Sequence, residues 1–203
     1  MLRSSVINIH RLDMTRIPVD QIWPLVDPKF TRAPDPLPPA SYVKRPRLLY
    51  YGLDDPDYSR PILAEVEACE LLRLHPHANG ARYLGCIVRE GRIRGLAFAK
   101  YSVTLSQMLK DGTYFDRSRC LRGIEAGVRH MHDLGLVHND LNPSNIMMDG
   151  EEAVIIDFDS CKREGDELGS KAGTDGWTLD SQDYAKREND LYSLSKIQAA
   201  LMK

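Results

Sequence analysis

The sequence predicts a mixed α+β fold, and the prediction depends on two β-hairpins and two long helices. Short apolar runs on either side of Asp149-Gly150, a strong turn signal, predict a hairpin that ends near residue 156. A second hairpin is predicted over residues 84–98. Residues 62–74 are rich in helix formers and contain no Gly or Pro, and residues 116–134 place apolar side chains on one face, so both are predicted to be helical.

Capping residues indicate where the predicted helices end. Asp116 can cap the long helix, because its carboxylate can accept a hydrogen bond from a first-turn amide, and Gly135 can close it. A shorter helix is predicted over residues 104–110, with Gly112 after it. Residues 31–40 contain four prolines and therefore predict a stiff, exposed linker.

Polar residues flank the predicted hairpin over residues 146–156 on both sides in the sequence. Asn145 directly precedes its first strand and Asp157 directly follows its second, so antiparallel pairing brings both residues together at the open end of the hairpin. Asp140 lies just upstream, close enough to receive a proton from an incoming hydroxyl. Carboxylate and amide oxygens are the ligands that Mg²⁺ prefers, so this pattern predicts a site for phosphoryl transfer.

These residues resemble the signature of the protein kinases. His138 to Asn145 resembles the catalytic loop H-R-D-x-x-x-x-N, and Asp157-Phe158-Asp159 resembles the D-F-G element. The resemblance implies a two-lobed fold, with a small β-rich N-lobe and a mainly helical C-lobe. It also implies ATP and Mg²⁺ as cofactors, Asp140 as catalytic base, Asn145 and Asp157 as metal ligands, and His138 as a structural brace.

Three positions depart from the protein kinase pattern. Asn139 replaces Arg, which suggests that activity does not depend on a phosphorylated activation loop. Asn142 replaces a Lys that contacts the transferring phosphate in protein kinases. Asp159 replaces the Gly of D-F-G, and residues 156–159 fit the I-D-x-D element of aminoglycoside and choline kinases. The loop by itself therefore leaves the substrate class open.

The upstream segments resemble a kinase N-lobe. Residues 62–74 resemble the αC helix, which implies that Glu65, with Glu67 as second choice, pairs with a strand lysine. Lys44 is the candidate for that lysine, and the alternative is an ordinary surface lysine. Residues 98–101 fall at the hinge that receives adenine, so backbone groups from Ala99 to Tyr101 are expected to bind the base.

The roof over the nucleotide phosphates is predicted to be abbreviated or built differently. The first glycine is Gly52, so no G-x-G-x-x-G loop exists in the first 51 residues. Ahead of the proline-rich segment, only residues 6–10 predict a strand. This departure weakens the expectation of ordinary ATP affinity.

Two downstream elements resemble protein kinases more than small-molecule kinases. Thr174, in Gly173-Thr174-Asp175-Gly176-Trp177, resembles the activation-segment threonine whose hydroxyl bonds to the catalytic loop. Asp190 resembles the helix αF aspartate that accepts N–H bonds from that loop, and the alternative is an acid that only favours the start of a helix. The chain ends at Lys203 without segments resembling helices αG to αI, and it resembles the small, C-terminally abbreviated kinase-like proteins of fungi.

The expected organisation has three parts: an N-terminal segment (1–41), an N-lobe-like part (42–101) and a C-lobe-like part (102–203). A protein serine/threonine kinase is the favoured function. The alternatives are a weak or inactive kinase-like binding module and a small-molecule phosphotransferase. A protein substrate or binding partner is expected, and the sequence does not indicate an oligomeric state.

Composition narrows the partners and the compartment. A net charge of −2 argues against a general nucleic-acid or membrane partner. The four cysteines form no C-x-x-C pair, so disulfides and metal binding by cysteine are not expected, and a reducing cytoplasmic or nuclear location is predicted. The sequence has no run of 18 apolar residues and no secretory signal, so neither membrane insertion nor secretion is expected.

Overall fold

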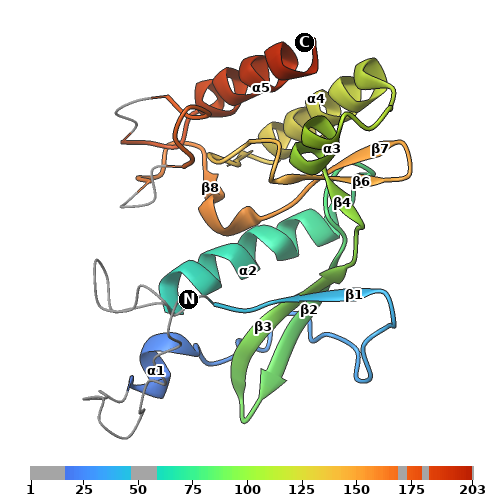
Figure 1. Cartoon of the computed structure of the whole chain (residues 1–203). Coiled ribbons are helices and arrows are strands. Elements are labelled where there is room, and N and C mark those ends of the chain that lie inside the picture. The colour runs from blue at the N-terminus through green and yellow to red at the C-terminus, as the bar shows by residue number, and fades with distance from the viewer. Residues whose placement is uncertain (1–16, 47–58, 169–172, 180–182, 203) are drawn as a thin grey trace, which may run out of the picture.

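The computed structural model describes residues 17–46, 59–168, 173–179 and 183–202. It has the predicted α+β class, with a small antiparallel sheet in one half and mainly helices in the other (Figure 1). The strand predicted at residues 6–10 lies outside the described residues. No helix among the described residues is long and apolar enough to cross a membrane.

The first half is a three-stranded antiparallel sheet with one long helix against it. The strands are β1 (Ser41–Lys44), β2 (Tyr83–Arg89) and β3 (Arg92–Ala99), in the order β1-β3-β2. The helix is α2 (Ser59–Leu74), which begins three residues before the predicted start. A one-turn helix, α1 (Val19–Ile22), precedes the sheet. The predicted hairpin over residues 84–98 is confirmed as β2–β3.

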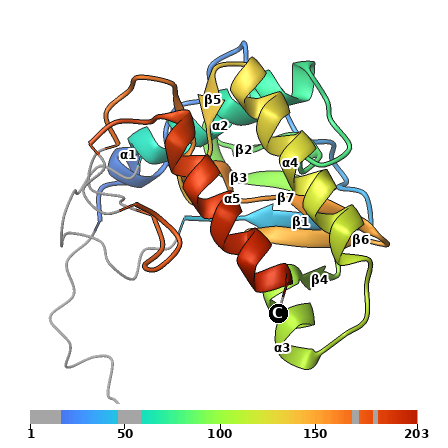
Figure 2. The ribbon, with the colours of Figure 1, turned by 90° about the horizontal axis from the view of Figure 1, so that it is seen from above.

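The second half combines helices with very short strands. Its helices are α3 (Leu105–Asp111), α4 (Arg117–Asp133), the one-turn 3₁₀ helix η2 (Phe158–Ser160) and α5 (Arg187–Leu201). Its strands are β4 (Val103–Thr104), β5 (Leu136–Val137), β6 (Ile146–Asp149), β7 (Glu152–Ile155) and β8 (Lys162–Arg163). They form the sheets β4-β6-β7 and β5-β8. Figure 2 shows α4 and α5 lying next to each other across this half.

The local signals that predict these elements are present in the structure. The carboxylate of Asp116 accepts a hydrogen bond from Arg119 N (2.8 Å), which caps α4 as expected. Gly135 follows the helix with φ of 71°, in the left-handed region that favours glycine. Gly112 ends α3 in the same conformation. Asp149 and Gly150 lie at the turn between β6 and β7.

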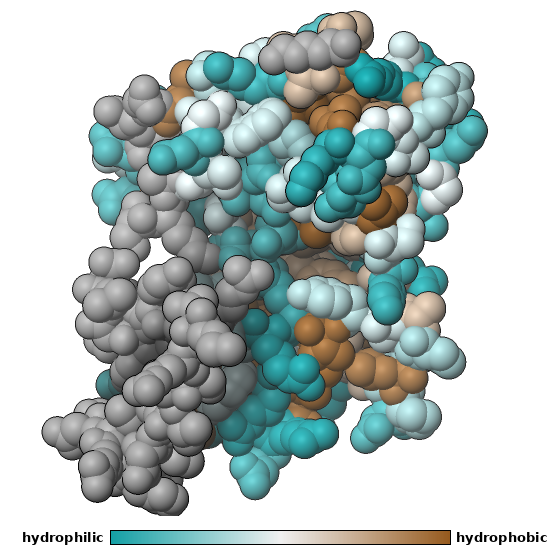
Figure 3. All heavy atoms as spheres, viewed as in Figure 1, coloured by the Kyte–Doolittle hydropathy of each residue, from teal (hydrophilic) through white to brown (hydrophobic). Residues whose placement is uncertain are grey.

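One hydrophobic core runs through both halves. The apolar face of α4 is buried against β7, and Gly127 makes this contact possible, since a Cβ at that position would lie 2.8 Å from Ile155 Cδ1. The loop before β2 runs beside β7, where Asn79 O accepts from Ile155 N (2.8 Å) and Ile155 O accepts from Ala81 N (2.9 Å). On the face seen in Figure 3, hydrophobic residues form small groups among hydrophilic ones.

The start of the predicted proline-rich linker is not a free linker. Thr31 O accepts from Cys86 N (2.8 Å), and Ala33 N donates to Cys86 O (2.9 Å), so this stretch pairs with β2. Proline content predicts that a segment is stiff. It does not show whether the edge of a sheet lies beside the segment, where the residues between the prolines can form backbone hydrogen bonds. Most of the remaining linker residues are exposed, as predicted.

Candidate active site

Lys44 joins the two halves of the molecule. It is the last residue of β1, and its Nζ lies 2.6 Å from Glu65 Oε1 on α2. The same Nζ contacts Asp157 Oδ1 and lies 3.6 Å from Asp159 Oδ2, both just beyond β7. The Lys44 side chain is only 22% exposed. Its environment is therefore a cluster of three carboxylates and not the open surface.

The structure distinguishes the two candidate partners of Lys44. Glu65 is 4% exposed and faces Lys44, whereas the side chain of Glu67 is 61% exposed and lies 3.5 Å from Lys29. Residues two apart on a helix point about 200° apart, so only one of them can face the cleft.

Burial and the charges of the cluster shift the pKa values of both Lys44 and Glu65. Burial alone would lower the pKa of Lys44, but the carboxylates of Glu65, Asp159 and Asp157 together raise this pKa above its usual value, so the ammonium stays charged. Burial raises the pKa of Glu65 to about 7, and the charge of Lys44 opposes this increase. The pair is therefore fully ionised only above neutral pH.

The raised pKa of Glu65 predicts a pH-dependent stability. Because the folded state holds this proton up to about pH 7 while the unfolded carboxyl loses it near 4.5, stability from this group decreases as pH rises between those values. The maximum slope is about 1.4 kcal/mol per pH unit. Urea unfolding of wild type and Glu65→Gln at pH 5 to 8 should show this decrease only in wild type.

Glu67→Gln is the matched control for this experiment, since Glu67 is two residues away and exposed. It should retain the wild-type pH profile. Parallel profiles for wild type and Glu65→Gln would contradict the assignment of the proton to Glu65.

The carboxylate of Asp140 is held by three side chains. Its Oδ2 accepts from Asn145 Nδ2 (3.0 Å), and its Oδ1 accepts from Thr174 Oγ1 (2.7 Å) and Asn142 Nδ2 (3.2 Å). Asn142 also contacts the Thr174 hydroxyl (3.3 Å). The sequence indicated only that Asn142 removes a positive charge, and its role in orienting Asp140 was missed.

The ends of β6 and β7 meet as the hairpin predicts. Ile156 N donates to Asn145 O (3.0 Å), so Asn145 and the residues before Asp157 lie side by side. Asn145 Nδ2 is turned toward Asp140, and among the described residues no hydrogen bond engages its Oδ1. An amide oxygen and carboxylate oxygens are ligand types that Mg²⁺ prefers, so Asn145, Asp157 and Asp159 fit this ion by their chemistry. Among the described residues, no three His, Cys, Asp or Glu side chains are grouped so as to hold a metal ion.

A buried carboxylate at the start of α5 binds backbone amides of the loop that carries Asp140. Asp190 is fully buried, and its two oxygens accept from His138 N and Asn139 N (both 2.9 Å). His132 Nε2 lies 2.8 Å from Asp190 Oδ2. Asp190 therefore does more than favour the start of a helix. His138 Nε2 in turn lies 3.0 Å from Ile156 O, which ties the loop to the end of β7.

Two residues of the site adopt the left-handed conformation that side chains rarely accept. They are Asn139 (φ 64°) and Asp157 (φ 65°). The Asn139 amide is buried: it donates to Val137 O (3.0 Å) and Ser160 O (3.1 Å) and accepts from Asn189 Nδ2 (3.0 Å). Asn at the kinase Arg position thus has a structural use. The one sequence signal for it is that Asn tolerates this conformation better than most residues.

The predicted hinge offers fewer backbone groups than expected. Ala99 N donates to Arg82 O (2.9 Å), and Lys100 N donates to Ala40 O (3.0 Å), so both amides are already engaged. Within the described part of the chain, Tyr101 N finds no acceptor, and its hydroxyl accepts from Arg82 N (3.1 Å). Among the backbone amides from Ala99 to Tyr101, that of Tyr101 is therefore the one left to donate to a base, within the described part of the chain.

The surroundings of the hinge also differ from the expected cleft. A cavity of about 630 Å³ borders Arg82, Ala99 and Tyr101 but is not lined by Lys44 or Asp157, so it lies beside the hinge and not at the charged cluster. Among the described residues, no strand pairs with the edge of β1 that faces away from β3. The described chain thus contains no glycine-rich roof over the cluster.

Comparison with known families decides what this arrangement is. Residues 55–203 match the family model described as the protein kinase domain. The chain belongs to the protein kinase family. This match covers both the αC-like helix with Glu65 and the whole loop from His138 to Asp159, and the fold and charged cluster of this kinase domain agree with it.

Several proteins and solved structures are similar to this kinase domain. A serine/threonine-protein kinase/endoribonuclease IRE1 of Hypocrea jecorina is 30% identical over an alignment of 122 residues, which covers 50% of this chain and 10% of that protein. A 3-deoxy-D-manno-octulosonic acid kinase of Vibrio vulnificus is 41% identical over 66 residues, or 32% of this chain and 24% of that protein. The crystal structure of the yeast RNA Pol II CTD kinase CTDK-1 complex matches with a TM-score of 0.57 at 19% identity, covering 70% of this chain and 49% of that chain.

These similarities have a limited reach. The kinase domain spans only about a tenth of the Hypocrea relative's length. The match to the CTDK-1 complex, at 19% identity, establishes the fold alone. Protein kinases generally transfer phosphate from ATP with Mg²⁺, and residues 55–203 of the present chain match that family.

Proposed function

We propose that this domain is an ATP- and Mg²⁺-dependent protein serine/threonine kinase. The observation that carries the proposal is the contact of one ammonium group, Lys44 Nζ, with Glu65 from one half and Asp157 from the other. A cation held by carboxylates from both halves is suited to receive the phosphates of a nucleotide bound between them.

In this proposal each charged or polar group has one task. Lys44 contacts the nucleotide phosphates, and Glu65 holds Lys44 in place. Asn145 and Asp157 hold Mg²⁺, which neutralises phosphate charge. Asp140, oriented by Asn145 and Thr174, accepts the proton of the substrate hydroxyl. The oxygen of that hydroxyl bonds to the γ-phosphorus of ATP while the bond from this phosphorus to the ADP oxygen breaks.

A protein substrate is supported by the contacts around the catalytic loop. Thr174 donates to Asp140, and Asp190 accepts from two loop amides, as expected of the protein kinases. Several relatives, including the Hypocrea protein and PSK1 of Saccharomyces cerevisiae, are named serine/threonine-protein kinases.

A small-molecule phosphotransferase is the second candidate. Asp159 stands where protein kinases carry Gly, and its Oδ2 lies 3.6 Å from Lys44 Nζ, the ammonium that also contacts Asp157. Its carboxylate is therefore a second candidate metal ligand. The Vibrio relative is named a sugar-acid kinase. A non-catalytic kinase-like module is the third candidate, supported by the missing glycine-rich roof among the described residues.

Mg-ATP binding provides the first test of this proposal. At about 100 times Kd, Mg-ATP should raise the melting temperature of wild type by about 5–10 °C, because binding stabilises only the folded state. Asp157→Asn should abolish this shift. Asp159→Asn is the matched variant. A small change in the Mg-ATP shift supports the protein kinase assignment, whereas loss of the shift, as in Asp157→Asn, supports a small-molecule phosphotransferase.

Phosphate transfer then separates the candidates. With radiolabelled ATP, wild type should label a mixture of proteins and should show little ADP release with aminoglycosides, choline and sugars. A Mg-ATP shift without any transfer would support the non-catalytic module. No shift at all would overturn the nucleotide-dependent proposal.

A further inference from the structure

Residues 24–33, called the clamp segment, lie between the edge of the first sheet and the outer side of α2. Four backbone hydrogen bonds fix the segment to β2, to β3 and to the turn between them, two at each end of the segment. They are Val26 N to Gly91 O (3.0 Å), Ile93 N to Pro24 O (2.9 Å), Cys86 N to Thr31 O (2.8 Å) and Ala33 N to Cys86 O (2.9 Å).

The backbone of the clamp segment lies so close to β2 that it leaves no room for a side chain at Gly85. Gly85 has φ of 125°, and a Cβ at this position would lie 2.5 Å from Ala33 N. A side chain there would displace the segment, so glycine is required for the close approach. Phe30 anchors the middle of the segment, because it is buried and belongs to the main core.

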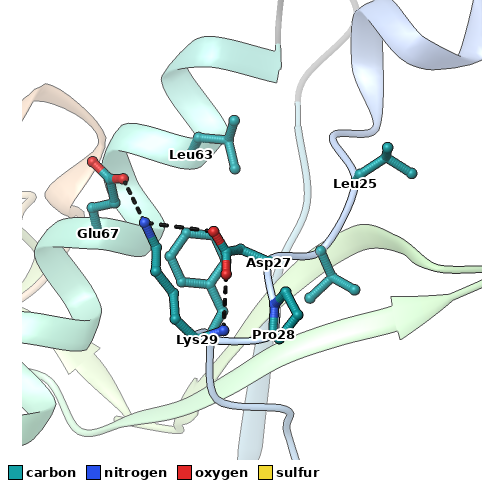
Figure 4. Close-up of a pocket in the computed structure, with 8 residues that line it drawn as sticks. Leu25, Asp27, Pro28, Lys29, Leu63 and Glu67 are labelled. Atoms are coloured by element: carbon teal, nitrogen blue, oxygen red, sulfur yellow. Dashed lines mark hydrogen bonds and ion pairs between the residues drawn. The ribbon is translucent and has the colours of Figure 1, made fainter.

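The clamp segment also binds α2 through its acidic outer face. Thr31 N donates to Glu70 Oε1 (2.6 Å), and Thr31 Oγ1 donates to Glu70 Oε2 (2.9 Å), so both carboxylate oxygens are engaged. Lys29 reaches to Glu67 on α2 and to Asp27 within the segment (Figure 4). Glu70 is only 13% exposed, whereas Lys29 and Glu67 are mostly exposed, so the Thr31–Glu70 contact is the stronger of the two.

Helix geometry connects this contact to the active site. Glu65 and Glu70 are five residues apart, which places them about 140° apart around α2. The inner carboxylate therefore meets Lys44 while the outer one meets the clamp segment. Because α2 is held from both sides, it cannot move away from the sheet without breaking the Thr31–Glu70 bonds.

We infer that Glu70 and Thr31 are positioning residues for phosphoryl transfer, acting through α2 to keep Glu65 against Lys44. The inference rests on the proposed function for its effect on nucleotide binding. The physical contact that it requires can be tested without any nucleotide.

Hydrogen exchange of the full chain tests the clamp directly. Amides of α2 exchange through local opening, and the loss of a bidentate charge-assisted contact should speed their exchange about tenfold or more. Glu70→Ala suits this test because Ala has a high helix propensity. The change also removes the Arg73–Glu70 pair within α2 (3.0 Å), whose i,i+3 contribution is only about 0.2–0.5 kcal/mol. Glu70→Gln, which keeps one acceptor for Thr31 N, should give an intermediate rate.

Controls separate local opening from general destabilisation. Exchange in α4 should be unchanged in Glu70→Ala, and Glu164→Ala, which removes the exposed Arg187–Glu164 pair in the other half of the molecule, should leave α2 at its wild-type rate. Should Glu70→Ala fail to fold, Thr31→Val removes the hydroxyl donor alone and should still speed α2 exchange severalfold. Unchanged α2 exchange, or an equal increase in α4, would overturn the inference.

A double-mutant cycle tests the link to Lys44. Glu70→Ala should weaken Mg-ATP affinity about tenfold in wild type and should have little further effect in Lys44→Met, because both changes act on the same pair. Additive effects would overturn the positioning role. If wild type does not bind Mg-ATP, the proposed function fails, and the exchange experiment alone decides whether the clamp exists.

Discussion

Replacing Asp140 by Asn is expected to reduce kcat about 10²- to 10⁴-fold, the range associated with a positioned general base. Asn has the same shape and can still accept from the Thr174 hydroxyl, which lies 2.7 Å from Asp140 Oδ1. It cannot take up a proton from the substrate hydroxyl. Steady-state transfer from radiolabelled ATP to casein, with calorimetry for Mg-ATP affinity, measures both quantities.

The affinity for Mg-ATP should change by less than about threefold in Asp140→Asn, since the proposed phosphate and metal contacts come from Lys44, Asn145 and Asp157. Asp111→Asn is the matched control, because Asp111 is an exposed residue of α3 whose carboxylate accepts from Gln107 Nε2 (2.7 Å). A wild-type rate for Asp140→Asn would exclude Asp140 as the base. A comparable loss in Asp111→Asn would show that the assay reports general damage.

Replacing Asp190 by Ala is expected to lower the free energy of unfolding by about 3–5 kcal/mol. Asp190 is fully buried and accepts from His138 N, Asn139 N and His132 Nε2. Without it, two buried amides and an imidazole lose their acceptor, and each unsatisfied group is costly because water cannot replace the lost partner. Urea unfolding followed by circular dichroism measures the change.

Glu188→Ala separates this effect from the helix dipole. Glu188 lies in the same first turn of α5 but is exposed, so its loss should cost only about 0.3–1 kcal/mol. Asp190→Asn, which keeps one acceptor oxygen, should fall between the two. Equal effects of Glu188→Ala and Asp190→Ala would mean that Asp190 acts only as an acid at a helix start.

Local sequence signals determined the elements that surround the site. The cap at Asp116, the glycine at 135 and the Asp149-Gly150 turn each act within a few residues, and all three occur where the sequence predicts them. The convergence of Asn145 with the end of β7 also followed from sequence, because the length of a hairpin fixes which residues meet at its open end.

Contacts between distant segments could not be predicted in the same way. The sequence ranked Glu65 above Glu67 only by resemblance, and it is the packing of α2 against β2 and η2 that turns Glu65 toward Lys44. The hydrogen bonds of Asn139 and Asn142 depend on groups brought in by other segments, including Ser160 and Thr174.

The sequence by itself determined the local elements that carry the kinase motif, because capping, turn geometry and hairpin pairing act over short distances. Only the tertiary structure decided how the proline-rich segment is used. The sequence predicts that Thr31 belongs to an exposed linker, yet Thr31 pairs with β2 and binds Glu70, 39 residues away. Such a contact depends on how a sheet edge and a helix face are arranged in space, and no periodicity within either segment encodes that arrangement.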